Sequence, residues 1–116
     1  MHILFIDDHK DSADAFAEIA LGLGHDVEVA YDGRTAMALT RGRQFDVVFF
    51  DIALPDADGR ELCRLARSDG ASRHACIIAV TGMTDLLEAE LEAFDGLLQK
   101  PISVEALQRA LKSAEG

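Results

Sequence analysis

Short apolar runs, each ending at polar or turn residues, recur along the chain. They cover residues 2–6, 25–30, 45–50, 76–80 and 96–99. Most of them lack alternation between apolar and polar positions, which is typical of strands buried on both faces of a parallel sheet. The run over 25–30 alternates weakly, through Val27 and Val29. The pattern therefore predicts five short strands.

Helical spacing of apolar residues fills the segments between these strands. In the segment 11–24, Phe16, Ile19 and Leu23 fall on one face of a helix. Asp11 or Ser12 is expected to cap its start. Helices are also predicted over residues 34–41, 59–69 and 85–94, and from residue 104 onward.

The alternation of strands and helices predicts an α/β fold with a parallel sheet covered by helices on both faces. Right-handed crossovers leave few possible topologies. Five strands fit the flavodoxin-like, doubly wound order 2-1-3-4-5, here with five helices. The 116 residues contain no linker or low-complexity stretch. We therefore expect residues 1–116 to form one domain, without a separate output domain.

Composition narrows the classes of partner and compartment. Apolar residues make up 49% of the chain, and the formal net charge is −10. This charge argues against nucleic acids and anionic membranes as partners. No apolar run approaches the roughly 20 residues of a membrane helix, and the start of the chain does not resemble a signal peptide. Cys63 and Cys76 lack metal-binding spacing and are expected to be small core residues in a reducing, cytoplasmic compartment.

Polar residues follow four of the predicted strands directly. Asp7 and Asp8 follow the first strand, Asp51 the third, Thr81 the fourth and Lys100 the fifth. In the order 2-1-3-4-5 these four strands are neighbours, and ligands of such sheets bind beyond the carboxyl ends of the strands. The sequence therefore predicts that three carboxylates, a hydroxyl and an ammonium group converge at one edge.

Three carboxylates in one site repel each other unless one is protonated or a cation lies among them. A hard divalent cation such as Mg²⁺ uses one or two carboxylates and leaves positions for phosphoryl oxygens. Together with Lys100 and Thr81, such a cation would form a site for a phosphoryl group. A free carboxylate there can attack phosphorus. Asp51 is the best candidate, because it ends the central strand between the acid pair and the Thr81–Lys100 pair.

Each of these residues also has an ordinary structural explanation. Asp7 and Asp8 could be solvated acids at a helix start, and Asp51 could be a turn residue. Thr81 could cap a helix, and Lys100 could be a surface charge. All four explanations would have to coincide at adjacent strand ends, which makes the common site the stronger hypothesis.

Taken together, Asp7-Asp8, the stretch DIALPDADG that starts at Asp51, Thr81-Gly82 and Lys100-Pro101 resemble the receiver domain of a two-component response regulator. The stretches LGLGHDVEVAYDG and FDGLLQKP are most similar to receivers attached to hybrid sensor histidine kinases. The resemblance extends from about residue 3 to the last helix.

The resemblance implies that Asp51 is the phosphoacceptor. It further implies that Mg²⁺ is held by Asp7, Asp8 and Asp51, with the backbone carbonyl of Ala53 as a further ligand. Asp8 would hold the metal most directly.

The same resemblance implies that Lys100 binds a phosphoryl oxygen and that Thr81 moves its hydroxyl to the phosphoryl group in the active state. The peptide bond before Pro101 would be cis. Leu97 stands where the family usually has an aromatic residue or His as a rotameric switch.

The implied function is a phosphorylation-dependent signalling switch and not a turnover enzyme. Its phosphodonor would be a sensor histidine kinase or a histidine phosphotransferase, its output partner is unknown, and it would be a monomer or a weak homodimer. Two alternatives are a receiver-fold interaction module that works without phosphorylation and a phosphotransferase of the haloacid dehalogenase type. The second needs an acid two residues after the nucleophile, where this chain has Ala53. A nucleotide or flavin binder is disfavoured, because the loop after the first strand, DDHKD, is not glycine-rich.

Overall fold

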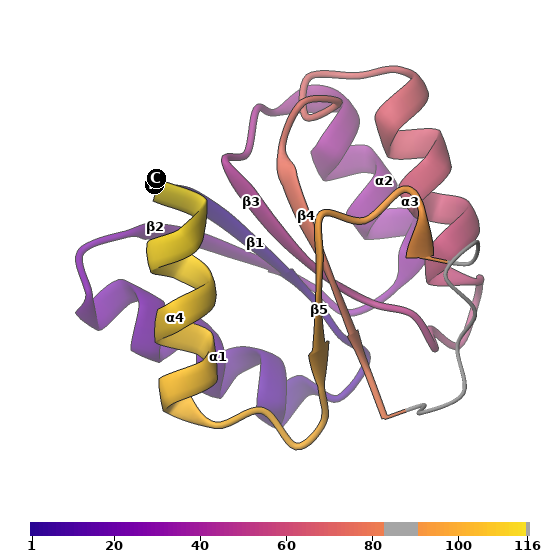
Figure 1. The fold of residues 1–116 in the computed structure, drawn as a ribbon. Coiled ribbons are helices and arrows are strands. Elements are labelled where there is room, and N and C mark those ends of the chain that lie inside the picture. Colours follow the sequence, from indigo (N-terminus) through magenta and orange to yellow (C-terminus); the bar gives the residue numbers. More distant parts are fainter. Residues whose placement is uncertain (83–90, 116) are drawn as a thin grey trace.

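Five parallel strands form the centre of the molecule in a computed structural model, which describes residues 1–82 and 91–115 (Figure 1). The strands are β1 (His2–Ile6), β2 (Asp26–Ala30), β3 (Val47–Asp51), β4 (Cys76–Thr81) and β5 (Gly96–Gln99). All neighbouring pairs are parallel, and their order is β2-β1-β3-β4-β5. The predicted fold class and strand order are confirmed.

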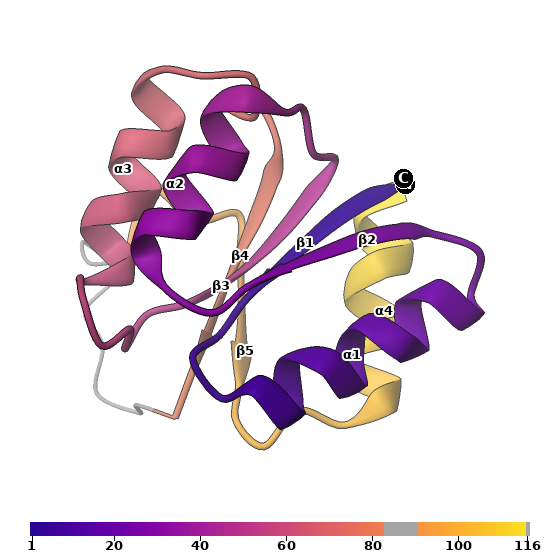
Figure 2. The same cartoon turned by 180° about the vertical axis from the view of Figure 1, so that it is seen from behind.

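Four α-helices cover the sheet within the described residues. They are α1 (Lys10–Gly22), α2 (Gly33–Gly42), α3 (Gly59–Ser68) and α4 (Val104–Glu115). α1 and α4 lie on one face, and α2 and α3 lie on the other (Figures 1 and 2). The fifth helix, predicted over 85–94, falls mostly outside the described residues, and residues 91–93 form a short turn instead. No described helix combines the length and apolar character needed to cross a bilayer.

The central strand β3 explains why the apolar runs do not alternate. Val47 and Phe49 belong to the core under α1 and α4, whereas Val48 and Phe50 belong to the core under α2 and α3. All four side chains are buried. On the first face, the ring of Phe49 stacks on that of Phe5 in β1, with 4.8 Å between centroids. A strand between two helical layers needs apolar residues at every position, because both of its faces are removed from water.

The start of α1 differs from the prediction of a cap at Asp11 or Ser12. The structure caps the helix with His9, whose Nδ1 accepts a hydrogen bond from the Ser12 amide at 3.2 Å. The His9 amide in turn donates to Asp7 Oδ1 at 2.9 Å. This turn is built directly on the end of β1, so the helix begins at Lys10, earlier than the apolar pattern indicated.

Candidate functional site

The carboxyl ends of β1, β3, β4 and β5 bring the predicted polar residues to one edge of the sheet. Asp51 is the last residue of β3 and pairs with Val80 in the ladder, and Thr81 is the last residue of β4. Asp7 follows β1 and anchors its amide on the Ala30 carbonyl at the end of β2. Asp7, Asp51 and Thr81 are buried, with 7%, 2% and 2% of their surface exposed. The sheet therefore places two carboxylates and a hydroxyl where little water reaches them.

Lys100 joins these acids from the end of β5. Its Nζ lies 3.1 Å from Asp51 Oδ2 and 3.3 Å from Asp7 Oδ2. Its amide donates to the Thr81 carbonyl at 2.8 Å, which ties the start of this loop to β4. The Lys100–Pro101 peptide bond is cis, as the resemblance implied. One ammonium group thus bridges two carboxylates at the ends of different strands.

Asp8 completes a cluster of three acids. Asp7, Asp8 and Asp51 each offer a carboxylate oxygen, and these oxygens all lie within 4.8 Å of one another. Asp8 is exposed, so the cluster opens to solvent on its side. Within the described residues, Lys100 is the ammonium group paired with this cluster, and the remaining negative charge of three carboxylates suits a divalent cation. Carboxylates on two strand ends are also the hard oxygen donors that Mg²⁺ prefers. The donor set therefore fits a magnesium ion.

The pKa values of Asp51 and Lys100 are both shifted in a way that fits a cation-binding site. Burial raises the pKa of Asp51 to about 6, although the hydrogen bonds from Lys100 and Ala53 and the charge of Lys100 pull it down. The charge of Asp7 also contributes to the raised pKa. For Lys100, burial alone would lower the pKa, but the hydrogen bonds and charges of Asp51 and Asp7 outweigh it, and the net pKa is raised. Lys100 therefore stays charged, whereas the pKa of Asp51 lies close to neutral pH.

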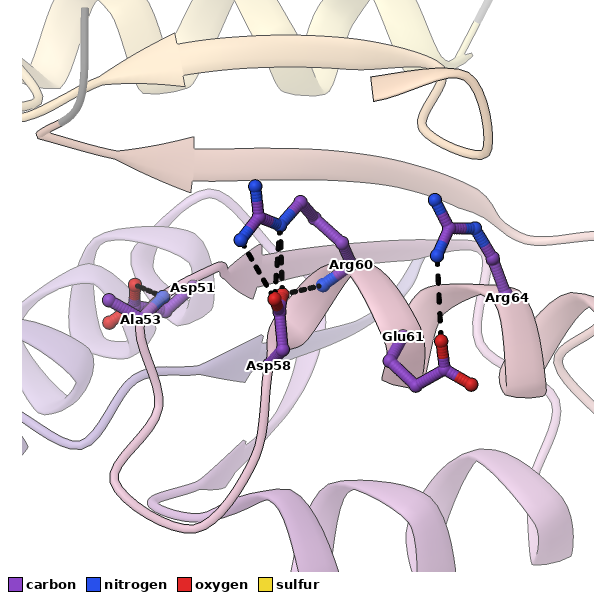
Figure 3. A network of polar contacts seen from close by, with 6 residues as sticks. All are labelled: Asp51, Ala53, Asp58, Arg60, Glu61 and Arg64. Carbon is purple, nitrogen blue, oxygen red and sulfur yellow. Dashed lines mark hydrogen bonds and ion pairs between the residues drawn. The ribbon is translucent and has the colours of Figure 1, made fainter. Parts of the chain in front are cut away.

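The loop from β3 to α3 holds the backbone of Ala53 against the carboxylate of Asp51 (Figure 3). The Ala53 amide donates to Asp51 Oδ1 at 3.0 Å. Ala53 also forms an isolated antiparallel bridge with Asp58, and the Gly59 amide donates to the Ile52 carbonyl at 2.8 Å. These backbone bonds close the base of the loop. Ala53, whose carbonyl is the predicted metal ligand, therefore lies in a hydrogen-bonded turn beside Asp51.

An open hollow of about 520 Å³ lies beside the acids, between the start of α1 and the loop after β5. Asp7 and Lys100 contribute polar groups to its lining, and Phe16, Pro101 and Ile102 contribute apolar surface. The cluster of polar groups is therefore open to solvent on this side, next to Asp7 and Lys100.

Comparison with known proteins agrees with this geometry. The family model of the response regulator receiver domain matches residues 3–112. The chain belongs to this family. Its members serve two-component signalling, and relatives of this receiver domain include sensor histidine kinases.

Three relatives illustrate the similarity. The receiver domain is 34% identical over 122 residues to the virulence sensor protein BvgS of Bordetella pertussis; the match covers 98% of this chain but only 10% of that sensor. A CheY-like receiver domain from Methylobacillus flagellatus superposes with a TM-score of 0.90 at 30% identity, over 98% of both chains. The receiver domain of sensor histidine kinase PA1611 from Pseudomonas aeruginosa has a TM-score of 0.88 at 27% identity, over 99% of this chain and 98% of that one. A magnesium ion is coordinated in its active-site cleft.

Two residues of the receiver domain were not identified as site residues from sequence. His9 orients Asp7 through its amide, as described above. Asp56, in the β3–α3 loop, accepts hydrogen bonds from the amides of Gly33 and Arg34 at the start of α2. The position of His9 directly after the acid pair was a usable signal. No pattern in the sequence pairs residue 56 with residues 33 and 34, since that contact depends on how the two loops meet.

Burial of Asp51 predicts a pH-dependent stability of the metal-free receiver domain. Its pKa rises from 3.8 to about 6 on folding, so between these values the folded state binds the proton more tightly than the unfolded state. The contribution of Asp51 to the free energy of unfolding therefore falls as pH rises through this window. Asp51→Asn removes the titration, so its stability advantage over the wild type should grow between about pH 4 and pH 7. Urea unfolding with a chelator at both pH values checks this; a difference that stays constant would contradict it.

Proposed function

We propose that this receiver domain is a phosphorylation-dependent switch, with Asp51 as the phosphoacceptor. One observation carries the proposal: the Lys100 ammonium group bridges the buried carboxylates of Asp51 and Asp7 beside the solvent-open Asp8. A structural ion pair needs one acid and one base. A site with a surplus of acids, an ammonium group and an adjacent hollow instead suits an incoming cation and phosphoryl group.

The proposed step is an in-line displacement at phosphorus. A carboxylate oxygen of Asp51 attacks the phosphorus of a phosphohistidine, the new O–P bond forms, and the P–N bond breaks with its electron pair going to the imidazole. Lys100, already 3.1 Å from Asp51 Oδ2, would exchange part of this contact for a phosphoryl oxygen. Thr81 would then direct its hydroxyl to another phosphoryl oxygen.

Asp7, Asp8 and Asp51 would hold Mg²⁺, together with the backbone carbonyl of Ala53. The bound ion would neutralise charge that builds up on the phosphoryl oxygens. Without it, the incoming phosphoryl group would meet three carboxylates with one ammonium group as counter-charge, which opposes the reaction.

The proposed partners follow from the family and from the exposed surface. The phosphodonor is a sensor histidine kinase or a histidine phosphotransferase in the cytoplasm. The output partner is a protein that binds the face formed by β5 and α4 differently before and after phosphorylation of Asp51. Leu97 of β5 is 41% exposed on this face. A leucine there offers partners an apolar contact in place of the usual aromatic ring. We further propose that residues 1–116 act as one domain, monomeric or weakly dimeric.

The proposal is tested by the intact mass of the protein after incubation with acetyl phosphate, with and without Mg²⁺. A single phosphoryl adduct that depends on Mg²⁺ supports it. No adduct, and no binding of beryllofluoride, would instead indicate an interaction module that works without phosphorylation.

Magnesium should stabilise the fold through Asp8. At about 100 times its dissociation constant, Mg²⁺ should raise the free energy of unfolding by about 2.7 kcal/mol. Asp8→Asn keeps the size of the side chain but removes one ligand charge, so most of this gain should disappear at the same Mg²⁺ concentration. Asp69→Asn, which changes an exposed acid at the far end of α3, is the matched control and should keep the gain. Thermal unfolding across a Mg²⁺ titration measures both; equal gains in the two variants would contradict the assignment of Asp8.

A further inference from the structure

The tip of the β3–α3 loop is attached to another helix through Asp56. Its Oδ1 accepts from the Gly33 amide at 2.8 Å, and its Oδ2 accepts from the Arg34 amide at 3.2 Å. Gly33 and Arg34 are the first residues of α2, whose amides have no partner within the helix. The partial positive charge of this helix end favours a carboxylate. Asp56 therefore forms a polar link between two segments that are 22 and 23 residues apart in the chain.

This link is additional to the ordinary cap of α2. Asp32 already caps the helix, with Oδ1 accepting from the Thr35 amide at 2.7 Å. The start of α2 also lies very close to the β3–α3 loop and to α3. A Cβ atom on Gly33 would lie 2.7 Å from Leu62 Cδ1 and 3.1 Å from Asp56 Oδ1. α2 thus has a local cap for its own stability and a second acceptor supplied by the loop that follows Asp51.

The loop is held at three levels between Asp51 and α3. At its base, Ala53 bridges to Asp58 and donates its amide to Asp51. In the middle, Leu54 is buried in the core under α2 and α3. At the exposed tip, Asp56 supplies the link to α2. Asp56 lies three residues from Ala53, so the tip and the backbone beside Asp51 belong to the same short loop.

We propose that Asp56 is a positioning residue, which fixes the β3–α3 loop on α2 so that the backbone of Ala53 stays against Asp51 at the metal site. This inference rests on the proposed function, since it concerns the same site. Asp56 would contact neither the metal nor the phosphoryl group. It would act by limiting the motion of the loop that carries one metal ligand.

The test compares Asp56→Ala with Asp32→Ala, because both variants remove one carboxylate cap from the start of α2. Mg²⁺ affinity is measured by titration at a temperature where both variants are folded, and amide hydrogen exchange is measured at Ala53 without metal. We expect Asp56→Ala to bind Mg²⁺ more weakly by up to about tenfold, the lower end of the effect of losing a group bonded directly to a ligand, because Asp56 acts through the loop. The Ala53 amide should also exchange faster. Asp32→Ala should lose stability but keep both values near those of the wild type.

A conservative variant separates positioning from folding. Asp56→Asn keeps an oxygen for the Gly33 amide and loses the acceptor for the Arg34 amide. Its Mg²⁺ affinity and the exchange rate of its Ala53 amide should therefore lie between those of the wild type and Asp56→Ala. If Asp56→Ala does not fold, the same measurements on Asp56→Asn and Asp32→Asn are compared instead. Equal Mg²⁺ affinities in the Asp56 and Asp32 variants, or unchanged exchange at Ala53, would overturn the inference. If the wild-type protein binds no Mg²⁺, the proposed function is wrong. Exchange of the Ala53 amide is measured without metal, so it still tests the role of Asp56 in that case.

Discussion

Asp51→Asn should give no phosphoryl adduct under conditions in which the wild type is fully modified. The amide has the same shape as the carboxylate but is a far weaker nucleophile, and it removes a negative charge from the metal cluster. The fold should persist, because the buried site loses a charge that burial disfavours. Intact mass after treatment with acetyl phosphate and Mg²⁺ measures the effect.

The control for this experiment is Asp69→Asn, which carries the same chemical change outside the cluster and should be modified like the wild type. Chelation of Mg²⁺ should abolish the adduct in both the wild type and the control. An adduct of undiminished yield in Asp51→Asn, mapped by peptide analysis to another residue, would overturn the assignment of the phosphoacceptor.

Gly59→Ala should destabilise the receiver domain by about 3 kcal/mol, the upper end of the usual cost of overpacking. Gly59 begins α3, and a Cβ atom there would lie 2.5 Å from the carbonyl oxygen of Asp51 and 2.7 Å from Ile52 Cα. Both neighbours are backbone atoms of a buried segment, so they cannot move aside as a flexible side chain would. The substitution should therefore displace the end of β3, and urea unfolding should measure the loss.

Gly22→Ala is the matched substitution for comparison. Gly22 ends α1, and a Cβ atom there meets nothing within 4 Å. Alanine should be neutral or stabilising by about 0.4–1 kcal/mol, because it restricts the unfolded chain without a clash. Similar losses in the two variants would mean that α3 does not depend on the close approach of Gly59 to β3. At a temperature where it is folded, Gly59→Ala should also be phosphorylated more slowly than Gly22→Ala.

Most of the fold was predictable because its strands are buried on both faces. The runs around Phe5 and Phe49 could not alternate, since each side of the sheet is covered by helices. Two features were not predicted, one local and one dependent on tertiary contact. The first is the start of α1 at Lys10, which depends on a turn built on the carboxylate of Asp7. The second is the attachment of the β3–α3 loop to α2 through Asp56.

The sequence by itself determined which polar groups meet at one edge of the sheet. Asp7, Asp51, Thr81 and Lys100 stand directly after apolar runs, and the order of those runs in a parallel sheet is enough to bring them to one edge. Only the tertiary structure decided the distances and the electrostatic interactions between these groups. The ammonium group of Lys100 lies between Asp51 and Asp7, and burial raises the pKa of Asp51 to about 6. The physical reason is that local patterns mark the strand ends and the alternation with helices makes the strands parallel, whereas distances and solvent exclusion depend on the packing of all the elements together.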